Sequence, residues 1–186
     1  MSIDRLKEGL PAYAKDLKLN LGNVTTSTAL SPRQVWGAMV ASALASRNKH
    51  VIGAIVAEAS GKLSPEELQG AKAAAAIMAM NNIYYRSAHL LEKPDYLQMP
   101  ARLRMSIIAN PGVEKLDFEL WSLAVSAVNG CGMCLAAHEK EVLGKGATKE
   151  GVQDALRIAA VVHAVSVVLE NEEAIATDAE TAGIVA

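Results

Sequence analysis

The sequence predicts an all-α fold. Of its 186 residues, 51% are hydrophobic but only 4% are aromatic, so the core has to be built from small and aliphatic side chains. Ala alone occurs 33 times, and it has the highest helix propensity of all residues. No run of alternating polar and apolar residues indicates a strand. The same composition excludes a chain that is disordered throughout.

Two Ser-Pro pairs mark helix starts, at residues 31–32 and 64–65. A Ser that caps a helix and a Pro at its first position form a typical N-terminal signature. Glu67 completes a capping box at the second pair. We therefore expect one helix that begins after Ser31 and a longer helix that runs from Ser64 towards Tyr85.

Turn signals organise the second half of the chain in the same way. Asn-Pro-Gly at 110–112 predicts a turn before a helix rich in Leu and Ala, and Asn-Gly at 129–130 predicts the end of that helix. A shorter helix is expected to begin at Cys131. Thr148 predicts the cap of a last helix, which we expect to reach roughly to Glu170.

The chain is expected to form one domain, residues 1–186, with a weak internal repeat. When the sequence is shifted by 84 residues, several Ser, Gln and Ala positions coincide. The predicted repeat halves are about 30–90 and 113–172. In this register Arg47 falls opposite Cys131, so only the second half would keep redox chemistry and the first would serve as scaffold.

The charge pattern excludes some classes of protein. The chain has 18 Lys+Arg and 20 Asp+Glu, a net charge of −2, which argues against a nucleic-acid binder or a polybasic membrane anchor. Its N-terminus lacks the apolar core of a signal peptide. The richest apolar stretch, Ala155 to Leu169, contains Arg157 and His163 and is shorter than the ~20 residues that span a bilayer. We expect a soluble, cytoplasmic protein.

Cys131, Cys134 and His138 form the motif CxxCxxxH. On a helix this spacing places all three on one face. In a reducing compartment such a pair is typical of catalysis or metal binding rather than of a permanent cross-link. The start of a helix favours a thiolate at Cys131, which can also close a disulfide with Cys134. His138 can exchange a proton near neutral pH, because the pKa of an unperturbed His is about 6.5.

Glu119 is the second unusual residue, because it borders the apolar stripe of the helix before the break at 129–130. That break allows the two helices to fold together and to bring Glu119 within reach of the cysteines or of His138. Burial there is expected to raise the pKa of the carboxyl group. Such a group could orient or deprotonate the imidazole.

Two other readings of the cysteines remain open. They could be two small buried apolar residues, or they could bind zinc. A zinc site needs four ligands, however, and His50, His89 and His163 are scattered singly along the chain. We therefore expect no metal and no bound cofactor, and we expect His163 to be a core histidine.

The run from Glu119 to Glu139, ELWSLAVSAVNGCGMCLAAHE, closely resembles the AhpD family of alkyl hydroperoxide reductases. This family is a branch of the carboxymuconolactone decarboxylase-like superfamily, and the likeness covers nearly the whole chain. The resemblance implies an all-α homotrimer that acts as an antioxidant, lipoyl-dependent peroxidase. Dihydrolipoyl groups on an acyltransferase subunit, supplied by dihydrolipoamide dehydrogenase and NADH, would reduce its disulfide. The dithiol would then reduce the peroxiredoxin AhpC or hydroperoxides directly.

The resemblance also implies roles for the site residues. Cys134 would form the sulfenic acid, Cys131 would donate a proton and then close the Cys131–Cys134 disulfide, and Glu119 and His138 would relay protons. Met133 stands where some members of the family have His. Helix position alone favours Cys131 as the more acidic, first-attacking thiol, because Cys134 lies deeper. The spacing to His138 favours Cys134 instead, because a paired imidazole activates the neighbouring thiol.

Two alternatives belong to other classes of function. One is a decarboxylase-like enzyme of the same superfamily, which would use Glu119 and His138 for acid–base work on a small lactone acid. The other is a non-enzymatic adaptor that only exchanges thiols and disulfides with a partner protein.

Overall fold

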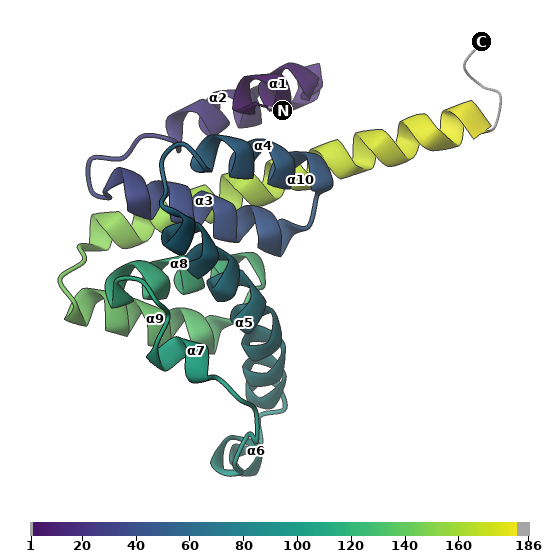
Figure 1. Cartoon of the computed structure of the whole chain (residues 1–186). Helices are drawn as coiled ribbons and strands as arrows, with labels where there is room; N and C mark the ends of the chain where they lie inside the picture. Colours follow the sequence, from purple (N-terminus) through teal and green to yellow (C-terminus); the bar gives the residue numbers. More distant parts are fainter. Residues whose placement is uncertain (1, 182–186) are drawn as a thin grey trace.

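The structure of the chain is a computed structural model that describes residues 2–181, and these residues form an all-α fold without strands, as predicted (Figure 1). The helices in chain order are α1 (Ile3–Gly9), the 3-10 turn η1 (Ala12–Ala14), α2 (Lys15–Asn23), α3 (Pro32–Ser46), α4 (Lys49–Ala59), α5 (Pro65–Leu90), α6 (Pro94–Gln98), α7 (Ser106–Ala109), α8 (Lys115–Val128), α9 (Gly132–Gly144) and α10 (Lys149–Thr181).

The capping box predicted with Glu67 is present, and the predicted cap Ser31 belongs to a second capping box. The Ser31 hydroxyl accepts a hydrogen bond from the Gln34 amide, and the Gln34 side chain accepts one from the Ser31 amide. Ser64 and Glu67 make the same pair of bonds at the start of α5. Each box satisfies two backbone N–H groups that the helix leaves unpaired, which explains why α3 and α5 begin where the sequence places them.

The expected end of the last helix near Glu170 is wrong, because α10 continues to Thr181. Residues in this additional part of α10 contact the start of α4. Glu170 accepts a hydrogen bond of 2.7 Å from Asn48, and Glu173 pairs with Lys49 and His50. Beyond these contacts α10 projects away from the rest of the molecule (Figure 1).

α10 also bears on the question of a membrane span. Residues Lys149–Asp178 are long and apolar enough to cross a membrane by length and composition alone, which the stretch 155–169 did not suggest. A core helix of a soluble protein passes the same test. α10 packs against α2, α3, α4, α8 and α9. Its buried face, which includes Ala155, Ile158 and Val162, recurs every three to four residues, as in a core helix.

The core centres on α3, which packs against α4, α5, α8 and α10. Trp121 of α8 is fully buried over Gly37 of α3, and its indole N–H donates to the carbonyl of Gln34 at 3.2 Å. A Cβ atom at Gly37 would lie 2.1 Å from the Trp121 ring. The glycine is therefore what lets α3 and α8 approach closely.

The order of helices is consistent with the predicted repeat. α3, α4 and α5 begin at residues 32, 49 and 65, and α8, α9 and α10 begin at 115, 132 and 149, so the offsets are 83, 83 and 84. The first helix of each set is followed by a left-handed residue, Arg47 at φ 67° and Gly130 at φ 66°. These caps place Asn48 rather than Arg47 opposite Cys131. The duplication itself stays a prediction.

Substitution of Gly37 tests the contact between α3 and α8. We expect Gly37→Ala to lower the free energy of unfolding by about 1–3 kcal/mol, because the new methyl group overpacks against Trp121. Gly53→Ala is the matched control on α4, where a Cβ meets nothing within 4 Å. It should raise stability by about 0.5–1 kcal/mol. Chemical denaturation at one protein concentration measures both, and equal effects would contradict the close approach.

Candidate functional site

The predicted break between α8 and α9 is a tight reversal of the chain. α8 ends at Val128, and Gly130 adopts φ 66°, a left-handed conformation that glycine tolerates best. The amide of Cys131 then donates to the carbonyl of Ser126 at 3.0 Å. Cys131 is the N-cap of α9, so the reversal fixes where the CxxC motif lies relative to α8.

The two cysteines lie together at the start of α9. Their sulfur atoms are at disulfide distance, 2.28 Å, with the Cα atoms 5.3 Å apart. The Cys134 amide also donates to the Cys131 sulfur at 3.3 Å. Cys131 is 0% exposed and Cys134 is 7% exposed. The expectation that Cys134 lies deeper is therefore wrong, because the turn folds Cys131 back against the end of α8.

Glu119 and His138 meet across the α8–α9 pair. The Glu119 Oε2 atom lies 2.6 Å from Nδ1 of His138, and both residues are buried. The other carboxylate oxygen of Glu119 lies 2.9 Å from Nζ of Lys115, one turn earlier on α8. Glu119 is predicted to lie within reach of the cysteines or of His138. In the structure it contacts the imidazole of His138.

The pKa of Glu119 is lowered, so the expected rise is wrong. Burial does push the pKa upwards, and it is the largest single effect. Hydrogen bonds from His138 and Lys115, together with their positive charges, outweigh burial. The lowered pKa favours the ionised form of Glu119, whose two oxygens contact Lys115 and His138.

The second ring nitrogen of His138 faces α5. Its Nε2 atom lies 3.2 Å from the sulfur of Met78, which is buried. An imidazolium would donate one N–H group to the Glu119 carboxylate and the other to this thioether, which is a weak acceptor. The two contacts fix the plane of the His138 ring. A proton on Nδ1 has Glu119 as its acceptor, and a proton on Nε2 has Met78.

A polar network from α5 holds the chain reversal. The Asn82 amide donates to the Ser126 hydroxyl at 2.9 Å, and the Asn129 amide donates to the Asn82 carbonyl oxygen at 3.0 Å. Arg86 donates to the backbone carbonyl of Asn129. Ser126 and Asn129 flank the end of α8, so these bonds tie α5 to the turn that carries Cys131.

Sequence reasoning missed these supporting residues. Lys115 stands four positions before Glu119, a spacing at which a helical Lys and Glu contact each other, so the sequence did contain its signal. Met78, Asn82 and Arg86 belong to a distant helix, and no local pattern connects them with the CxxC motif.

The other histidines lie away from this site. His163 is exposed and its Nδ1 atom lies 3.3 Å from the Ser46 hydroxyl, so the expectation of a core histidine is wrong. The buried stripe of α10 passes through Val162 and Val165 and leaves residue 163 outside it. His50 pairs with Glu173 at 3.2 Å. Among the described residues, no group of three His, Cys, Asp or Glu could hold a metal ion.

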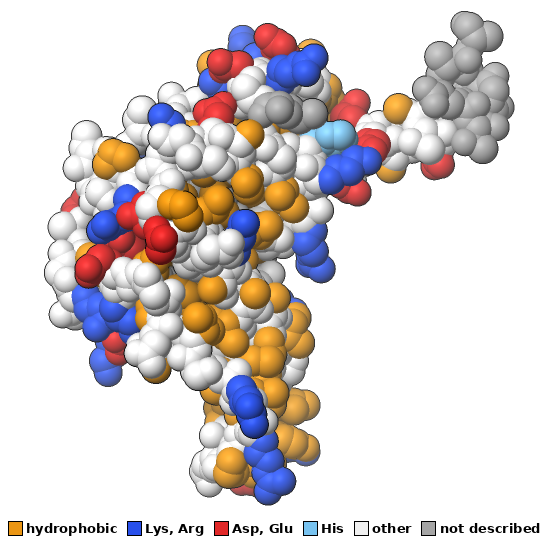
Figure 2. Space-filling view, in the orientation of Figure 1, with side chains coloured by type: hydrophobic (Ala, Val, Ile, Leu, Met, Phe, Trp, Pro, Cys, Tyr) orange, Lys and Arg blue, Asp and Glu red, His pale blue; other side chains and the backbone are white. Residues whose placement is uncertain are grey.

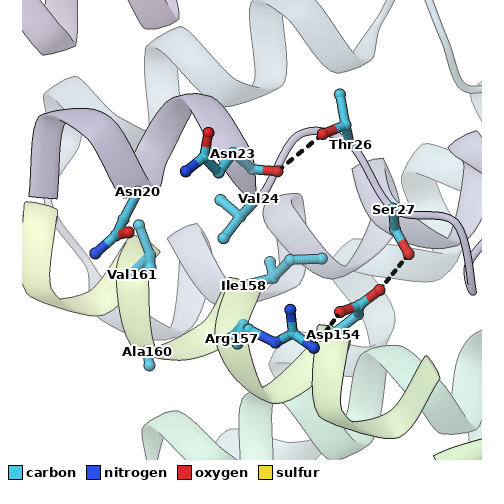
Figure 3. Close-up of a pocket in the computed structure, with 10 residues that line it drawn as sticks. All are labelled: Asn20, Asn23, Val24, Thr26, Ser27, Asp154, Arg157, Ile158, Ala160 and Val161. Carbon is cyan, nitrogen blue, oxygen red and sulfur yellow. Dashed lines mark hydrogen bonds and ion pairs between the residues drawn. The ribbon is translucent and has the colours of Figure 1, made fainter. Parts of the chain in front are cut away.

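A separate hollow of about 330 Å³ lies between the end of α2, the following loop and α10 (Figure 3). Its charged groups are already paired, because Asp154 accepts from Ser27 and lies 2.9 Å from Arg157. None of the four predicted site residues lines it. It therefore has no contact with the cysteines.

Comparison with known proteins agrees with this geometry. Residues 94–178 match the family described as the carboxymuconolactone decarboxylase family. Three relatives are each named alkyl hydroperoxide reductase AhpD: those of Rhodospirillum centenum (62% identical, covering 94% of both chains), Gluconacetobacter diazotrophicus (61%, covering 94% of this chain and 96% of the relative) and Frankia alni (56%, covering 93% and 94%). The chain therefore belongs to the AhpD family of alkyl hydroperoxide reductases.

Proposed function

We propose that the chain reduces hydroperoxides, oxidised AhpC, or both, through a dithiol formed by Cys131 and Cys134. The observation that carries this proposal is the buried Glu119–His138 pair, held on the same α8–α9 unit as two cysteines at disulfide distance. A redox pair and a proton carrier on one rigid unit are what a thiol peroxidase needs.

The proposed cycle has three steps. The Cys134 thiolate attacks the terminal oxygen of the hydroperoxide, which gives a sulfenic acid and, after protonation, an alcohol. The Cys131 thiol then attacks the sulfenic sulfur, and one water leaves as the disulfide forms. A dihydrolipoyl group reduces this disulfide by exchange and itself becomes a cyclic disulfide.

Exposure supports Cys134 as the residue that meets peroxide. It is the more exposed of the two, whereas Cys131 is fully enclosed. The position of Cys131 at the helix N-terminus, where its sulfur accepts the Cys134 amide, favours negative charge on that sulfur. Such a thiolate suits the resolving step and departs readily when a dithiol attacks the disulfide.

The proposed relay uses the charge state of Glu119. An ionised Glu119 keeps the Nδ1 proton of His138 in place, so Nε2, which lies against the weak acceptor Met78, would be the nitrogen that exchanges protons during the cycle. Lys115 supports this state because it helps to lower the pKa of Glu119. Met133 stands where some members of the family have His, so the proposed relay contains one imidazole, that of His138, together with Glu119.

The proposed reductant and partners follow the family. We propose that lipoyl groups on an acyltransferase subunit serve as the reductant, that dihydrolipoamide dehydrogenase regenerates them with NADH, and that AhpC is the peroxiredoxin partner. The relatives are named alkyl hydroperoxide reductase AhpD, which supports a place in that system. A reducing cytoplasm suits such a dithiol cycle.

We also propose that the chain forms a homotrimer. Large hydrophobic side chains are exposed along the end of α5 and through α6, among them Leu90, Leu91, Leu97 and Met99. Figure 2 shows hydrophobic side chains gathered over this arm of the molecule. Apolar patches of this kind mark surfaces that contact another protein. A further copy of the chain would cover the arm.

Cys134→Ser tests the peroxidase cycle. We expect it to abolish NADH consumption in a mixture of dihydrolipoamide dehydrogenase, lipoamide and a hydroperoxide. Cys131→Ser is the matched variant: it should also lose turnover, yet it should form a sulfenic acid once, which dimedone traps for mass spectrometry. Peroxide consumption that survives Cys134→Ser would contradict the cycle.

The same assay separates the alternatives. NADH consumption that requires added AhpC, even in the wild type, would identify an adaptor. Turnover of a small lactone acid that survives alkylation of both cysteines would identify the decarboxylase-like enzyme.

Glu119→Gln tests the relay. We expect kcat/KM for hydroperoxide to fall by about 10²-fold, because Gln cannot stabilise a positive imidazole. The pKa of Glu119 is lower in the folded protein than in the unfolded chain, so ionised Glu119 adds to the free energy of unfolding. This contribution is complete above the unfolded pKa of about 4.3, and it is lost as the pH falls through the lower pKa of the folded protein. The stability difference from wild type should therefore shrink below about pH 4 in denaturation curves. Glu139→Gln is the control, and an equal loss of activity there would exclude a specific relay.

Light scattering tests the homotrimer. The wild type should have three times the 19.6 kDa mass of the chain. A double substitution, Leu90→Glu with Leu97→Glu, should reduce the mass to that of a single chain. Leu19→Glu on α2, where Leu19 is 58% exposed, is the control and should leave the mass unchanged. A wild type of 19.6 kDa would contradict the assembly.

A further inference from the structure

A groove of about 410 Å³ runs between α3 and α5 and reaches the turn that carries Cys131. We call it the α3–α5 groove. Its apolar lining includes Leu44 of α3 and Ala75, Ala79 and Ile83 of α5. This volume lies within the range of small-molecule sites, which are mostly apolar with a few polar groups.

Two cations line the same groove, Arg47 from the end of α3 and Lys72 from α5. Within residues 2–181, neither side chain has a hydrogen-bond or ion-pair partner. Arg33, Lys49 and Lys115, by contrast, all pair with carboxylates. The groove therefore joins an apolar surface to positive charge that the chain itself does not neutralise.

Asn129 connects the groove with the candidate active site. It lines the groove, and it lies two residues before Cys131. Its amide donates to Asn82 and its carbonyl accepts from Arg86, so the turn is held firmly where the groove ends. A molecule in the groove would lie beside the turn that carries the redox pair.

We propose that the α3–α5 groove binds the alkyl chain and the carboxylate of a fatty acid, and that fatty-acid hydroperoxides are a substrate class of this site. The aliphatic lining takes the alkyl chain, and Arg47 and Lys72 take the carboxylate, because guanidinium and ammonium groups form strong charge-assisted hydrogen bonds with carboxylates. The choice of substrate class rests on the proposed peroxidase function, whereas binding of the fatty acid does not.

Calorimetry with decanoate, which carries no peroxide, tests binding on its own. Decanoate should bind the wild type, and Arg47→Gln with Lys72→Gln should weaken binding at least tenfold. Decanol should bind both proteins equally, because it lacks the carboxylate. Arg5→Gln with Lys18→Gln removes two exposed cations of α1 and α2 and should leave decanoate binding unchanged. Absence of decanoate binding, or equal loss in both double variants, would overturn the proposal.

Kinetics then test the substrate class. The groove variant should lower kcat/KM for a fatty-acid hydroperoxide about tenfold and leave kcat/KM for uncharged cumene hydroperoxide unchanged. An equal effect on both substrates, or a changed molecular mass in light scattering, would show that the groove is a structural or self-association surface and would overturn the proposal. If neither hydroperoxide is consumed by the wild type, the proposed function fails, and decanoate binding still decides whether the groove is a fatty-acid site.

Discussion

The chain reversal between α8 and α9 is the constraint on which the candidate site depends. A left-handed Gly130 lets α9 fold back along α8, and the amide of Cys131 closes the turn on Ser126. Only this antiparallel course brings Glu119 of one helix against His138 of the next. Asn82 and Arg86 hold the same turn from α5, so a helix distant in the sequence fixes the position of the CxxC motif.

The electrostatics of the site follow from a balance rather than from burial alone. Removing a carboxylate from water disfavours its charge, and for Glu119 this is the largest single effect. Lys115 and His138 reverse the outcome, because each contacts a separate oxygen of Glu119 and lowers its pKa. Lys115 thus helps to keep the carboxylate charged, and the second oxygen of Glu119 holds the imidazole of His138 in place.

The surface around this site divides into regions of different character. The end of α5 with α6 presents exposed aliphatic side chains, the surface that we propose contacts another copy of the chain. The α3–α5 groove combines an apolar lining with two cations that no described residue pairs with, and it ends at Asn129. In the hollow beside α10, Asp154 and Arg157 pair with each other, and none of the predicted site residues lines it.

The sequence by itself determined the helical class, the starts of α3 and α5, and the turn at 129–130. These features depend on neighbours three or four residues apart, through caps, propensities and helix periodicity, so they can be read locally. The family resemblance of the run from Glu119 to Glu139 is equally a property of the sequence.

Only the tertiary structure decided the charge of Glu119, the relative exposure of the two cysteines, the contact of Met78 with His138 and the full length of α10. The sequence already held the Lys115–Glu119 spacing, but it could not say whether hydrogen-bonding partners would outweigh the effect of burial on the Glu119 pKa. Exposure and pKa are sums over everything that packs around a group. Those neighbours come from helices far apart in the chain, and no local pattern records how they pack.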